Sequence, residues 1–378
     1  MAVRAGTERV ISDKMNWLAE HGHRVSLVTY EQGNHPLAFS LHPDIMVNDL
    51  DTRFFTLSVL PFYRRIFEFY IMRNLFAKRL QRIVDETNPD VIVTTTYSLK
   101  LATDIVRLST KACNVMESHT ACFSVGKEQD FQDKPVIKFF AKLFDKWYFR
   151  SVSSFDLLIV LTDGDGKDWS RYTDNIKVIP NPVTYYPEEI DPKKIYHRII
   201  CVARLTYQKG LDMLVDAFAK IGGKYPEWHV DIYGDGEDKE KLFAQINRLG
   251  LDDKINILPP TNNIYQEYQN SDFYVLSSRY EGYPLVLNEA MSCGTPCVAF
   301  RCKYGPEDAI VDKESGLLVK DGDVDELSKK MEWMIVHGQE RLEMGKKARL
   351  SAARYKKDVV MQAWEQAYLS VMKTNSNH

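Results

Sequence analysis

Short apolar runs alternate with amphipathic stretches along most of the chain. Runs such as Arg198–Ala203 (RIICVA) and Phe273–Leu276 (FYVL) are apolar without interruption at their centres, which is typical of parallel strands buried on both faces. Stretches such as Leu211–Ile221 and Asp238–Leu249 instead have apolar residues at helical spacing. Further strands are predicted at His23–Tyr30, Asp90–Thr95, Leu157–Leu161, His229–Tyr233, Ile255–Leu258 and Pro296–Phe300. The alternation predicts parallel sheets built from strand–helix–strand units.

A proline-rich segment divides this pattern into two halves. Pro180, Pro182 and Pro187 favour extended backbone, as in a linker between domains. A length of 378 residues also exceeds what one hydrophobic core usually organises. We therefore predict an α/β protein of two Rossmann-like, doubly wound domains with an interdomain cleft, in which ligands bind outside the carboxyl ends of the strands.

The beginning of the chain departs from the pattern. Met1–Thr7 is predicted to be a loop, and Glu8–Glu20 a helix that leads into the strand His23–Tyr30. A doubly wound domain ordinarily begins with a strand before such a loop. We predict that the N-terminal domain lacks its first strand; the alternative is a sheet that begins one strand later.

Composition excludes several classes of protein. Hydrophobic residues at 44% and charged residues at 27% are ordinary for a globular protein, and a net charge of −3 gives no general attraction to nucleic acid. No apolar run approaches the roughly 18 residues of a membrane-spanning helix, and the first residues have no secretory-signal core. The six cysteines form no C-x-x-C pair, which favours reduced thiols in a cytoplasmic protein. We expect a cytoplasmic location and no cofactor, metal or nucleic-acid partner.

One segment in the second half predicts an anion site. The strand Phe273–Leu276 is followed by a predicted helix, Leu285–Cys293, with Pro284 in its first turn and Gly294 at its end. The backbone amides of Gly282 to Leu285 would then point out of the helix start, where the helix dipole favours a diphosphate. Such a site suits a nucleotide-diphosphate ligand.

Four charged residues accompany this segment. Glu281 and Glu289 could accept hydrogen bonds from sugar and ribose hydroxyls, and Arg204 and Lys209 follow a predicted strand, where they would meet the charge of a diphosphate. On residue type alone, all four could instead belong to solvated surfaces.

The segment SSRYEGYPLVLNEAMSCGTP resembles the signature of the family 4 retaining nucleotide-sugar glycosyltransferases (group 1), which have the GT-B fold. The hallmark of that family is two glutamates separated by seven residues, here Glu281 and Glu289. RLTYQKG is similar to its Arg-x4-Lys element, YGDGEDKEKL to its Gly-x-Gly turn, IPNPV to its interdomain connection and ESGLLV to its closing turn. The resemblance covers nearly the whole chain.

The resemblance implies domains and site residues. Residues 1–182 would bind the acceptor, residues 183–355 the nucleotide sugar, and a final helix within 356–378 would cross back to the N-terminal domain. His119 lies in an element similar to the family's E-x-H, and Gly6 in a loop that would approach the diphosphate. The implied catalytic residues are His119, Glu281, Lys209 and Arg204. The implied donor-binding residues are Gly6, Thr7, Arg204, Lys209, Pro260, Glu281, Gly282, Tyr283, Pro284, Leu285 and Glu289. The loop of Pro260 would contact the base, although its Pro-Pro sequence departs from the family pattern.

The implied reaction is transfer of a hexosyl residue, with retention, from a nucleotide-diphosphate sugar (UDP-sugar favoured) to a hydroxyl of a cell-surface glycan or lipid-linked saccharide. Fixed cations, Arg204 and Lys209, would replace a metal ion at the leaving diphosphate. Two alternatives remain open: a non-catalytic sugar-nucleotide-binding subunit of a glycan assembly complex, and a GT-B sugar-nucleotide epimerase.

Two segments combine basic and aromatic residues. Residues 53–82 contain seven Lys or Arg and one acidic residue, Glu68, together with many aromatic side chains, and residues 138–150 (KFFAKLFDKWYFR) are similar. Such surfaces suit peripheral contact with an anionic membrane, here the inner face of the cell membrane. The alternative is that the aromatic side chains are core and the cations solvated.

Overall fold

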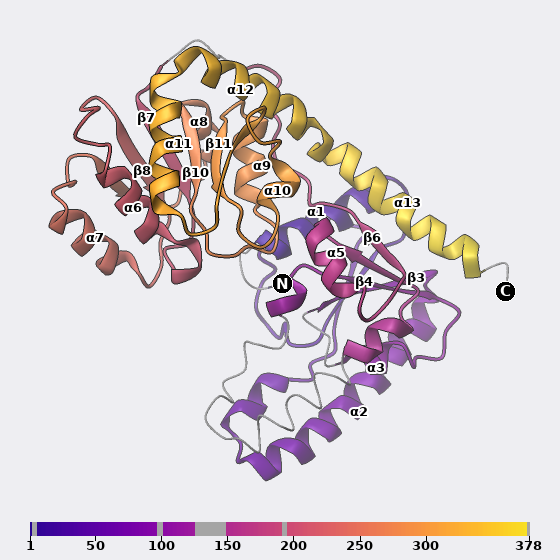
Figure 1. Cartoon of the computed structure of the whole chain (residues 1–378). Coiled ribbons are helices and arrows are strands. Elements are labelled where there is room, and N and C mark those ends of the chain that lie inside the picture. Colours follow the sequence, from indigo (N-terminus) through magenta and orange to yellow (C-terminus); the bar gives the residue numbers. More distant parts are fainter. Residues whose placement is uncertain (2–5, 97–100, 125–148, 191–194, 376–378) are drawn as a thin grey trace. The chain divides into compact units, whose positions relative to one another are not determined.

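The chain forms two compact units in a computed structural model that describes residues 1, 6–96, 101–124, 149–190 and 195–375 (Figure 1). Unit 1 consists of Met1–Val160, Gly166–Ile179 and Met361–His378, and unit 2 of Leu161–Asp165 and Pro180–Val360. The predicted boundaries at residues 182/183 and 355/356 lie within five residues of these limits.

Unit 1 is built on two separate parallel sheets. One sheet pairs β1 with β2, and the other has the strand order β3-β4-β5-β6. The strands are β1 (Ser26–Thr29), β2 (Met46–Asp49), β3 (Val91–Thr95), β4 (Cys113–Glu117), β5 (Leu157–Val160) and β6 (Ile176–Val178). The helices of four or more residues with residues in this unit are α1 (Gly6–Glu20), α2 (Phe62–Thr87), α3 (Ala102–Ile105), α5 (Asp163–Trp169) and α13 (Lys357–Asn375). Short 3-10 turns cover Phe54–Val59, Cys122–Ser124 and Val152–Ser154.

The start of unit 1 differs from the sequence prediction in one respect. Helix α1 begins at Gly6, so Gly6 and Thr7 belong to its first turn and not to a preceding loop. Within the described residues β1 pairs only with β2, and β3 pairs only with β4. The expectation of a missing first strand stays a prediction.

Unit 2 is organised around one six-stranded parallel sheet with the order β12-β11-β10-β7-β8-β9. Its strands are β7 (Arg198–Val202), β8 (His229–Tyr233), β9 (Ile255–Leu258), β10 (Phe273–Leu276), β11 (Cys297–Phe300) and β12 (Gly316–Val319). Its helices are α6 (Leu211–Ala219), α7 (Lys239–Arg248), α8 (Ile264–Gln269), α9 (Leu285–Ser292), α10 (Pro306–Ala309), α11 (Val324–Val336) and α12 (Gly338–Ala352), with 3-10 turns η5 (Tyr207–Lys209) and η6 (Ala353–Tyr355). Adjacent β7 and β10 bring their following loops to the same edge.

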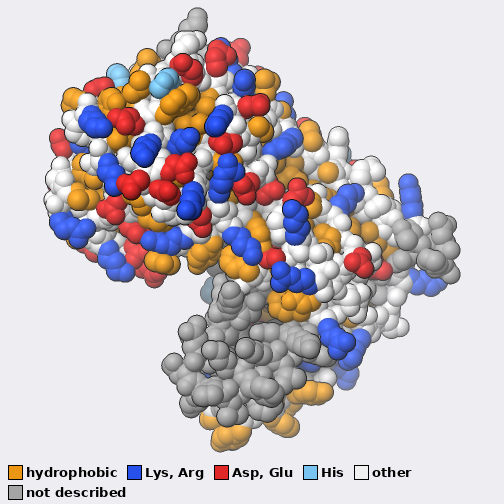
Figure 2. Space-filling view, viewed as in Figure 1, with side chains coloured by type: hydrophobic (Ala, Val, Ile, Leu, Met, Phe, Trp, Pro, Cys, Tyr) orange, Lys and Arg blue, Asp and Glu red, His pale blue; other side chains and the backbone are white. Residues whose placement is uncertain are grey.

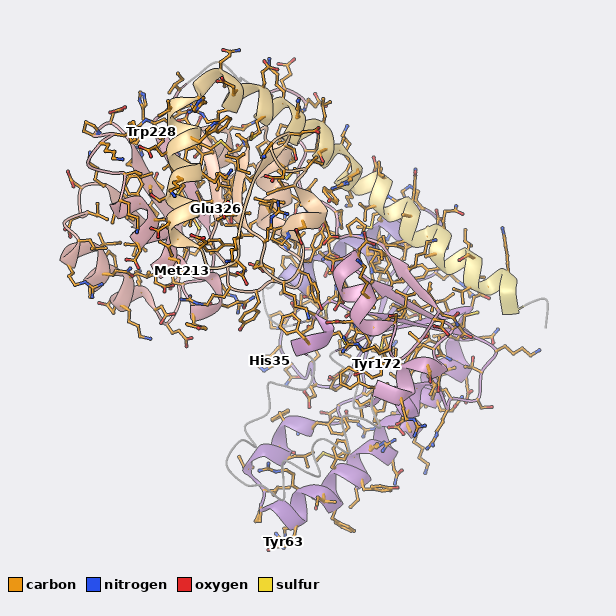
Figure 3. The ribbon with its side chains drawn as sticks, viewed as in Figure 1. His35, Tyr63, Tyr172, Met213, Trp228 and Glu326 are labelled. Carbon is orange, nitrogen blue, oxygen red and sulfur yellow. The ribbon has the colours of Figure 1, made fainter. Side chains whose placement is uncertain are left out.

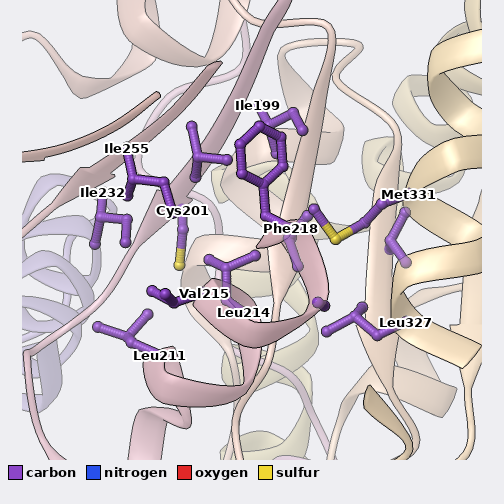
Figure 4. Packing of buried hydrophobic residues seen from close by; sticks show 14 of the residues in the cluster. Ile199, Cys201, Leu211, Leu214, Val215, Phe218, Ile232, Ile255, Leu327 and Met331 are labelled. Carbon is purple, nitrogen blue, oxygen red and sulfur yellow. The ribbon is translucent and has the colours of Figure 1, made fainter. Parts of the chain in front are cut away.

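The main core of unit 2 lies between this sheet and helices α6 and α11 (Figure 4). Phe218 and Leu214 of α6 meet Ile199 of β7, and Met331 and Leu327 of α11 close the cluster. All five side chains are completely buried. Outside this core, the visible face of unit 2 carries interspersed basic and acidic side chains (Figure 2).

A buried ion pair ties α12 to the amino end of the sheet. Arg341 donates to Asp272 at 2.8 Å, and its guanidinium lies 5.1 Å from the ring centre of Trp228. Burial lowers the pKa of Arg341, against the opposing charge of Asp272. Arg341 also donates to the carbonyl of Met334. The pair therefore joins one helix to another and to the start of β10.

All six cysteines are free and buried. Burial raises the pKa of Cys201 and of Cys293 to about 12, so these thiols stay protonated at neutral pH. This agrees with the expectation of reduced, structural thiols.

Candidate active site

The loops that follow β7 and β10 are bonded to each other at the carboxyl edge of the unit 2 sheet. The amide of Arg279 donates to the carbonyl of Gln208 at 2.8 Å, and the Gln208 amide group donates to the carbonyl of Tyr280 at 3.0 Å. The Ser277 hydroxyl donates to the carbonyl of Lys209 at 3.1 Å. The two loops that carry the predicted cations and glutamate are thus held as one structure.

Gly210 makes this close approach possible. Its φ of +60° lies in the left-handed region, and a Cβ atom there would lie 2.1 Å from the carbonyl oxygen of Ser277. Any other residue at this position would push the two loops apart, so the glycine of RLTYQKG is required by the site geometry.

Lys209 and Glu281 meet at the centre of the paired loops. The Lys209 ammonium lies 2.6 Å from Oε1 of Glu281, and the Ser278 hydroxyl donates to the same oxygen at 2.6 Å. The side chains of Lys209 and Glu281 are 14% and 5% exposed. The predicted phosphate cation and the predicted sugar carboxylate are therefore in direct contact at the carboxyl ends of the strands.

The start of α9 corrects the predicted amide cluster. The helix begins at Leu285, as predicted, with Pro284 at its N-cap; Pro284 has no N–H group, and the Leu285 amide donates to the carbonyl of Tyr283 at 3.0 Å. Within the described residues, the amides of Gly282 and Tyr283 donate no hydrogen bond, so these two remain for an anion. The Tyr283 side chain points inward, where its hydroxyl donates to the carbonyl of Asn181 at 3.2 Å. Helix α9 ends at Ser292, and Gly294 follows with a φ of +77°, as predicted for a helix stop.

The loop after β11 supports this turn from the other side. The amide of Glu281 donates to the carbonyl of Lys303 at 2.5 Å, and the amide of Tyr304 donates to the carbonyl of Glu281 at 2.9 Å. Gly305 has a φ of +99°, and a Cβ atom there would lie 2.3 Å from Cδ of Pro284. Both backbone groups of Glu281 are consequently fixed, and its carboxylate is oriented.

The remaining predicted donor residues of unit 2 lie on several elements. Arg204 follows β7 and is exposed, and the described residues offer its guanidinium no carboxylate partner. Glu289 lies on α9 and accepts a hydrogen bond from the Tyr265 hydroxyl at 3.1 Å. Pro260 is exposed after β9, the edge strand of the sheet. The base-contact role of Pro260 stays a prediction.

Unit 1 places His119 in a network of polar groups. His119 lies two residues beyond β4, and its Nε2 is 3.0 Å from Oε2 of Glu117. Gly6 and Thr7 occupy the first turn of α1. The roles of Gly6 and Thr7 at a diphosphate stay predictions.

Several functional partners were not predicted from the sequence. Ser278 orients Glu281, Tyr265 contacts Glu289, and Lys14 and Tyr368 both contact Glu117. For Lys14 a signal was available, because it lies at helical spacing from Val10 and Trp17, on the buried face of α1. A lysine on an apolar face indicates a buried anionic partner.

Asp-x-Asp pairs, which often bind a divalent ion beside a diphosphate, occur at Asp49/Asp51, Asp163/Asp165, Asp321/Asp323 and Asp323/Asp325. Asp49 accepts hydrogen bonds from the amides of Gln32 and Gly33, and Asp51 pairs with Arg53. The part of the chain that the structure describes holds no group of three or more His, Cys, Asp or Glu side chains placed to bind a metal ion.

Family models identify the two halves of the chain. The model of glycosyltransferase family 4 matches residues 4–185, and that of glycosyl transferases group 1 matches residues 186–351. The chain belongs to the group 1 glycosyltransferases. The boundary between the two family matches, between residues 185 and 186, falls in the predicted linker between the domains.

Individual relatives support the same assignment. An uncharacterized glycosyltransferase of Haemophilus influenzae is 28% identical to this glycosyltransferase over 362 residues, 95% of each chain. The lipopolysaccharide 1,6-galactosyltransferase of Salmonella typhimurium is 33% identical over 163 residues, which are 40% of this chain and 44% of that protein. The solved structure of the Anabaena protein HepE in complex with UDP matches with a TM-score of 0.75 at 17% identity, over 98% of each chain. The fold is therefore GT-B, with two Rossmann-like units, as predicted.

Proposed function

We propose that this glycosyltransferase transfers a hexosyl residue, with retention of configuration and without a metal ion, from a nucleotide-diphosphate sugar to a hydroxyl of a cell-surface glycan or lipid-linked saccharide. We assign the donor to residues 183–355 and the acceptor to residues 1–182. UDP is the favoured nucleotide, because a protein of the same fold was solved with UDP. A glycan acceptor is supported by the similarity to a lipopolysaccharide galactosyltransferase.

The observation that carries this proposal is the Lys209–Glu281 contact at 2.6 Å. A diphosphate near the free amides of Gly282 and Tyr283 would also meet the Lys209 ammonium, while Glu281 accepts a sugar hydroxyl. Arg204, which is exposed in the same loop as Lys209, would add a second positive charge. In unit 1, we assign His119 to the donor sugar or the phosphate.

In the proposed reaction the bond between the anomeric carbon and the diphosphate oxygen breaks while the acceptor oxygen bonds to the same face of the sugar. The acceptor proton passes to the leaving diphosphate oxygen, so no separate general base is required. Fixed positive charge near the diphosphate lowers the barrier to its departure, because it stabilises the charge that develops there.

The test is acceptor-dependent release of nucleoside diphosphate by the purified chain, screened over nucleotide sugars and glycan acceptors. Lys209→Ala is expected to lower kcat by about 100- to 1,000-fold, the usual effect of removing a preorganised charge-stabilising group. Lys220→Ala is the control, because Lys220 of the same unit forms an exposed pair with Asp325. Normal turnover by Lys209→Ala would contradict the proposed role of Lys209. Donor binding without release would favour a non-catalytic subunit, and conversion of the sugar itself an epimerase. A rate that requires Mg²⁺ and is abolished by a chelator would contradict metal independence.

We also propose peripheral membrane contact through the outer face of α2. Tyr63, Ile66, Phe67, Tyr70 and Ile71, here called the α2 stripe, recur at helical spacing and are all exposed, Tyr63 at 72% (Figure 3). Such a stripe with tyrosines suits the interface of a bilayer. The described part of the chain has no helix long and apolar enough to cross a membrane.

The structure changes the expected balance between electrostatic and apolar attraction of this surface to a membrane. Arg53 pairs with Asp51, Arg73 with Asp104 and Arg82 with Glu86. Fewer cations are therefore available for anionic lipid than the sequence alone indicated, and apolar contact gains weight. Residues 138–148 lie outside the described residues, and Phe149 stacks on Tyr172 with ring centres 4.6 Å apart.

Sedimentation with lipid vesicles tests the membrane proposal. A Phe67→Ser, Tyr70→Ser variant should lose binding to vesicles with anionic lipid, and Val336→Ser, an exposed apolar residue of unit 2, should retain it. Equal binding by the two variants would overturn the assignment of the α2 stripe.

A further inference from the structure

One buried carboxylate in unit 1 receives hydrogen bonds from three segments far apart in the sequence. Lys14 of α1 donates to Oε2 of Glu117 at 2.5 Å, and Nε2 of His119 lies 3.0 Å from the same oxygen. The Tyr368 hydroxyl of α13 donates to Oε1 at 2.5 Å. The ring of Trp364, also in α13, covers the Lys14 ammonium at 3.4 Å from its centre. All of these side chains are buried.

The Glu117 carboxylate stays ionised in spite of its burial. Burial would raise the pKa of Glu117, but the charge of Lys14 and the hydrogen bonds from His119 and Lys14 lower it to about 2. Burial lowers the pKa of Lys14, and Glu117 opposes that change. A buried ion pair is a costly way to join helices, because apolar residues of the same volume often give equal or greater stability. Packing alone therefore gives little reason for this arrangement.

The consequence of the network falls on the imidazole of His119. A carboxylate can only accept, so the His119 nitrogen that faces Glu117, Nε2, carries the proton. Nδ1 is buried and has no hydrogen-bond partner in the described structure. In the neutral ring Nδ1 then presents a lone pair, which accepts a hydrogen bond from a hydroxyl and is repelled by a phosphate oxygen.

The backbone around His119 is also fixed. The amide of Ser118 donates to the carbonyl of Ile159 at 2.8 Å, and the Ser118 hydroxyl donates to the carbonyl of Thr120 at 2.9 Å. Trp169 donates to the Ser118 hydroxyl at 3.2 Å. With the backbone held, the bond to Glu117 decides which nitrogen of the ring is free.

We propose that Lys14, Glu117 and Tyr368 are positioning residues that fix the tautomer and orientation of His119, so that Nδ1 accepts a hydrogen bond from a hydroxyl of the sugar substrate. The inference rests on the proposed function and deepens it, because it selects the sugar and not the phosphate as the partner of His119. Buried carboxylates that orient a histidine act in this way in catalytic triads and metal sites. Through Tyr368, helix α13 contributes to a site whose histidine lies about 250 residues earlier in the chain.

The experiment combines kinetics with NMR of ¹⁵N-labelled histidine, in which the His119 signals are identified by their loss in His119→Asn. The wild type should show His119 protonated at Nε2. Glu117→Gln should shift the ring toward the Nδ1–H tautomer, because the glutamine amide can donate to Nε2. The kcat/KM of Glu117→Gln, measured with the best nucleotide sugar from the transfer assay, should be about 10- to 100-fold lower than that of the wild type, by analogy with groups that orient metal-binding histidines. Tyr368→Phe is the milder variant and should lower kcat/KM about 10-fold or less.

Asp272→Asn is the matched control. It also converts a buried carboxylate, paired with a cation over a tryptophan ring, into the isosteric amide, but in unit 2 and without a histidine. It should lower stability and leave the His119 tautomer and kcat/KM unchanged. The proposal is overturned if Glu117→Gln and Tyr368→Phe behave like this control. If the wild type transfers no sugar, the proposed function fails separately, and the tautomer of the ligand-free protein still decides the positioning role.

Discussion

Each unit contains a close lysine–glutamate pair of the same chemical type. Lys14 and Glu117 are 2.5 Å apart in unit 1, and Lys209 and Glu281 are 2.6 Å apart in unit 2. In both pairs the glutamate also accepts a hydroxyl hydrogen bond, from Tyr368 and Ser278 respectively. The surroundings differ, because Lys14 lies within a helix beneath Trp364, whereas Lys209 lies in a loop at a strand end and is more exposed.

From this comparison we infer two roles for a lysine–glutamate pair. The pair can orient a neighbouring side chain, or its lysine can exchange the glutamate for a ligand. Both oxygens of Glu117 are bonded to side chains of helices α1 and α13, so the pair has little freedom to rearrange. Lys209 contacts Glu281, the residue that precedes the free amides of Gly282 and Tyr283, and we expect a phosphate oxygen to replace Glu281 as its partner. We therefore assign the two pairs different roles: the pair of unit 1 positions His119, and the lysine of the unit 2 pair binds the donor phosphate.

The largest expected contrast is in stability. Lys14→Met leaves the Glu117 charge buried without its cation and should lower the free energy of unfolding by about 3–5 kcal/mol. Lys209→Met should cost less, because the Lys209 side chain is 14% exposed whereas that of Lys14 is 6% exposed. Urea unfolding measures both, with Lys220→Met, from an exposed pair, expected to change stability by no more than about 0.5 kcal/mol. Equal losses for Lys14→Met and Lys209→Met would remove the distinction between the pairs.

A pH series examines the charge of the unit 1 pair. The ordinary pKa of glutamate is 4.5, and that of Glu117 in the folded protein is about 2. The ionised carboxylate therefore stabilises the fold fully above about pH 5, and this contribution is lost as the pH falls toward 2. The difference in unfolding free energy between wild type and Glu117→Gln should be on the order of a few kcal/mol at pH 7 and should narrow between pH 5 and pH 3. A difference that is constant over this range would show that the charge of Glu117 is not the source of stability.

The smallest expected effects come from the two hydroxyl donors. Tyr368→Phe removes a buried hydrogen bond to a carboxylate and should lower the free energy of unfolding by about 1.5–3 kcal/mol. Ser278→Ala should lower it by about 1 kcal/mol or less, because Lys209 still donates to the same oxygen of Glu281, whereas Tyr368 is the donor to the Glu117 oxygen that Lys14 does not contact. Thermal unfolding of both variants at one pH measures these losses of stability. A greater loss for Ser278→Ala than for Tyr368→Phe would contradict the prediction.

The parts of the fold that could be predicted are those in which local pattern and burial agree. His229–Tyr233, Ile255–Leu258 and Phe273–Leu276 match strands β8, β9 and β10 residue for residue. The pattern is clearest for β10, an interior strand of the parallel sheet that is apolar along its whole length. Strand β2 was missed, since Met46–Asp49 is largely exposed and mixes polar with apolar residues. Strand β12 was missed because ESGLLV was assigned to the closing turn of the family, and Gly316 is instead required by the close approach of the Cys297 carbonyl.

The candidate site likewise has residues that could be predicted from the sequence and residues that could not. The motif around Glu281 is contiguous, so its residues could be named in advance, and the Lys209 loop could be placed near it by the rule for strand ends. Of the four positions predicted to offer amides, Pro284 has no N–H group, which the sequence alone shows. The loss of the Leu285 amide depended on local geometry, because it donates to the carbonyl of Tyr283. Lys14, Glu117 and Tyr368 could not be associated beforehand, because their contacts join helices α1 and α13 across a strand between them.

The position of Tyr368 has a consequence for biosynthesis. The ribosome makes residues 14 and 117 first, then all of unit 2, and only afterwards the helix that supplies the second donor to Glu117. The six-stranded sheet of unit 2 can therefore form while unit 1 still lacks part of its interior, although domains made first generally fold first. During that interval the buried charge of Glu117 is only partly compensated. Unit 1 then remains incompletely folded, and open to chaperone binding, until helix α13 has been synthesised.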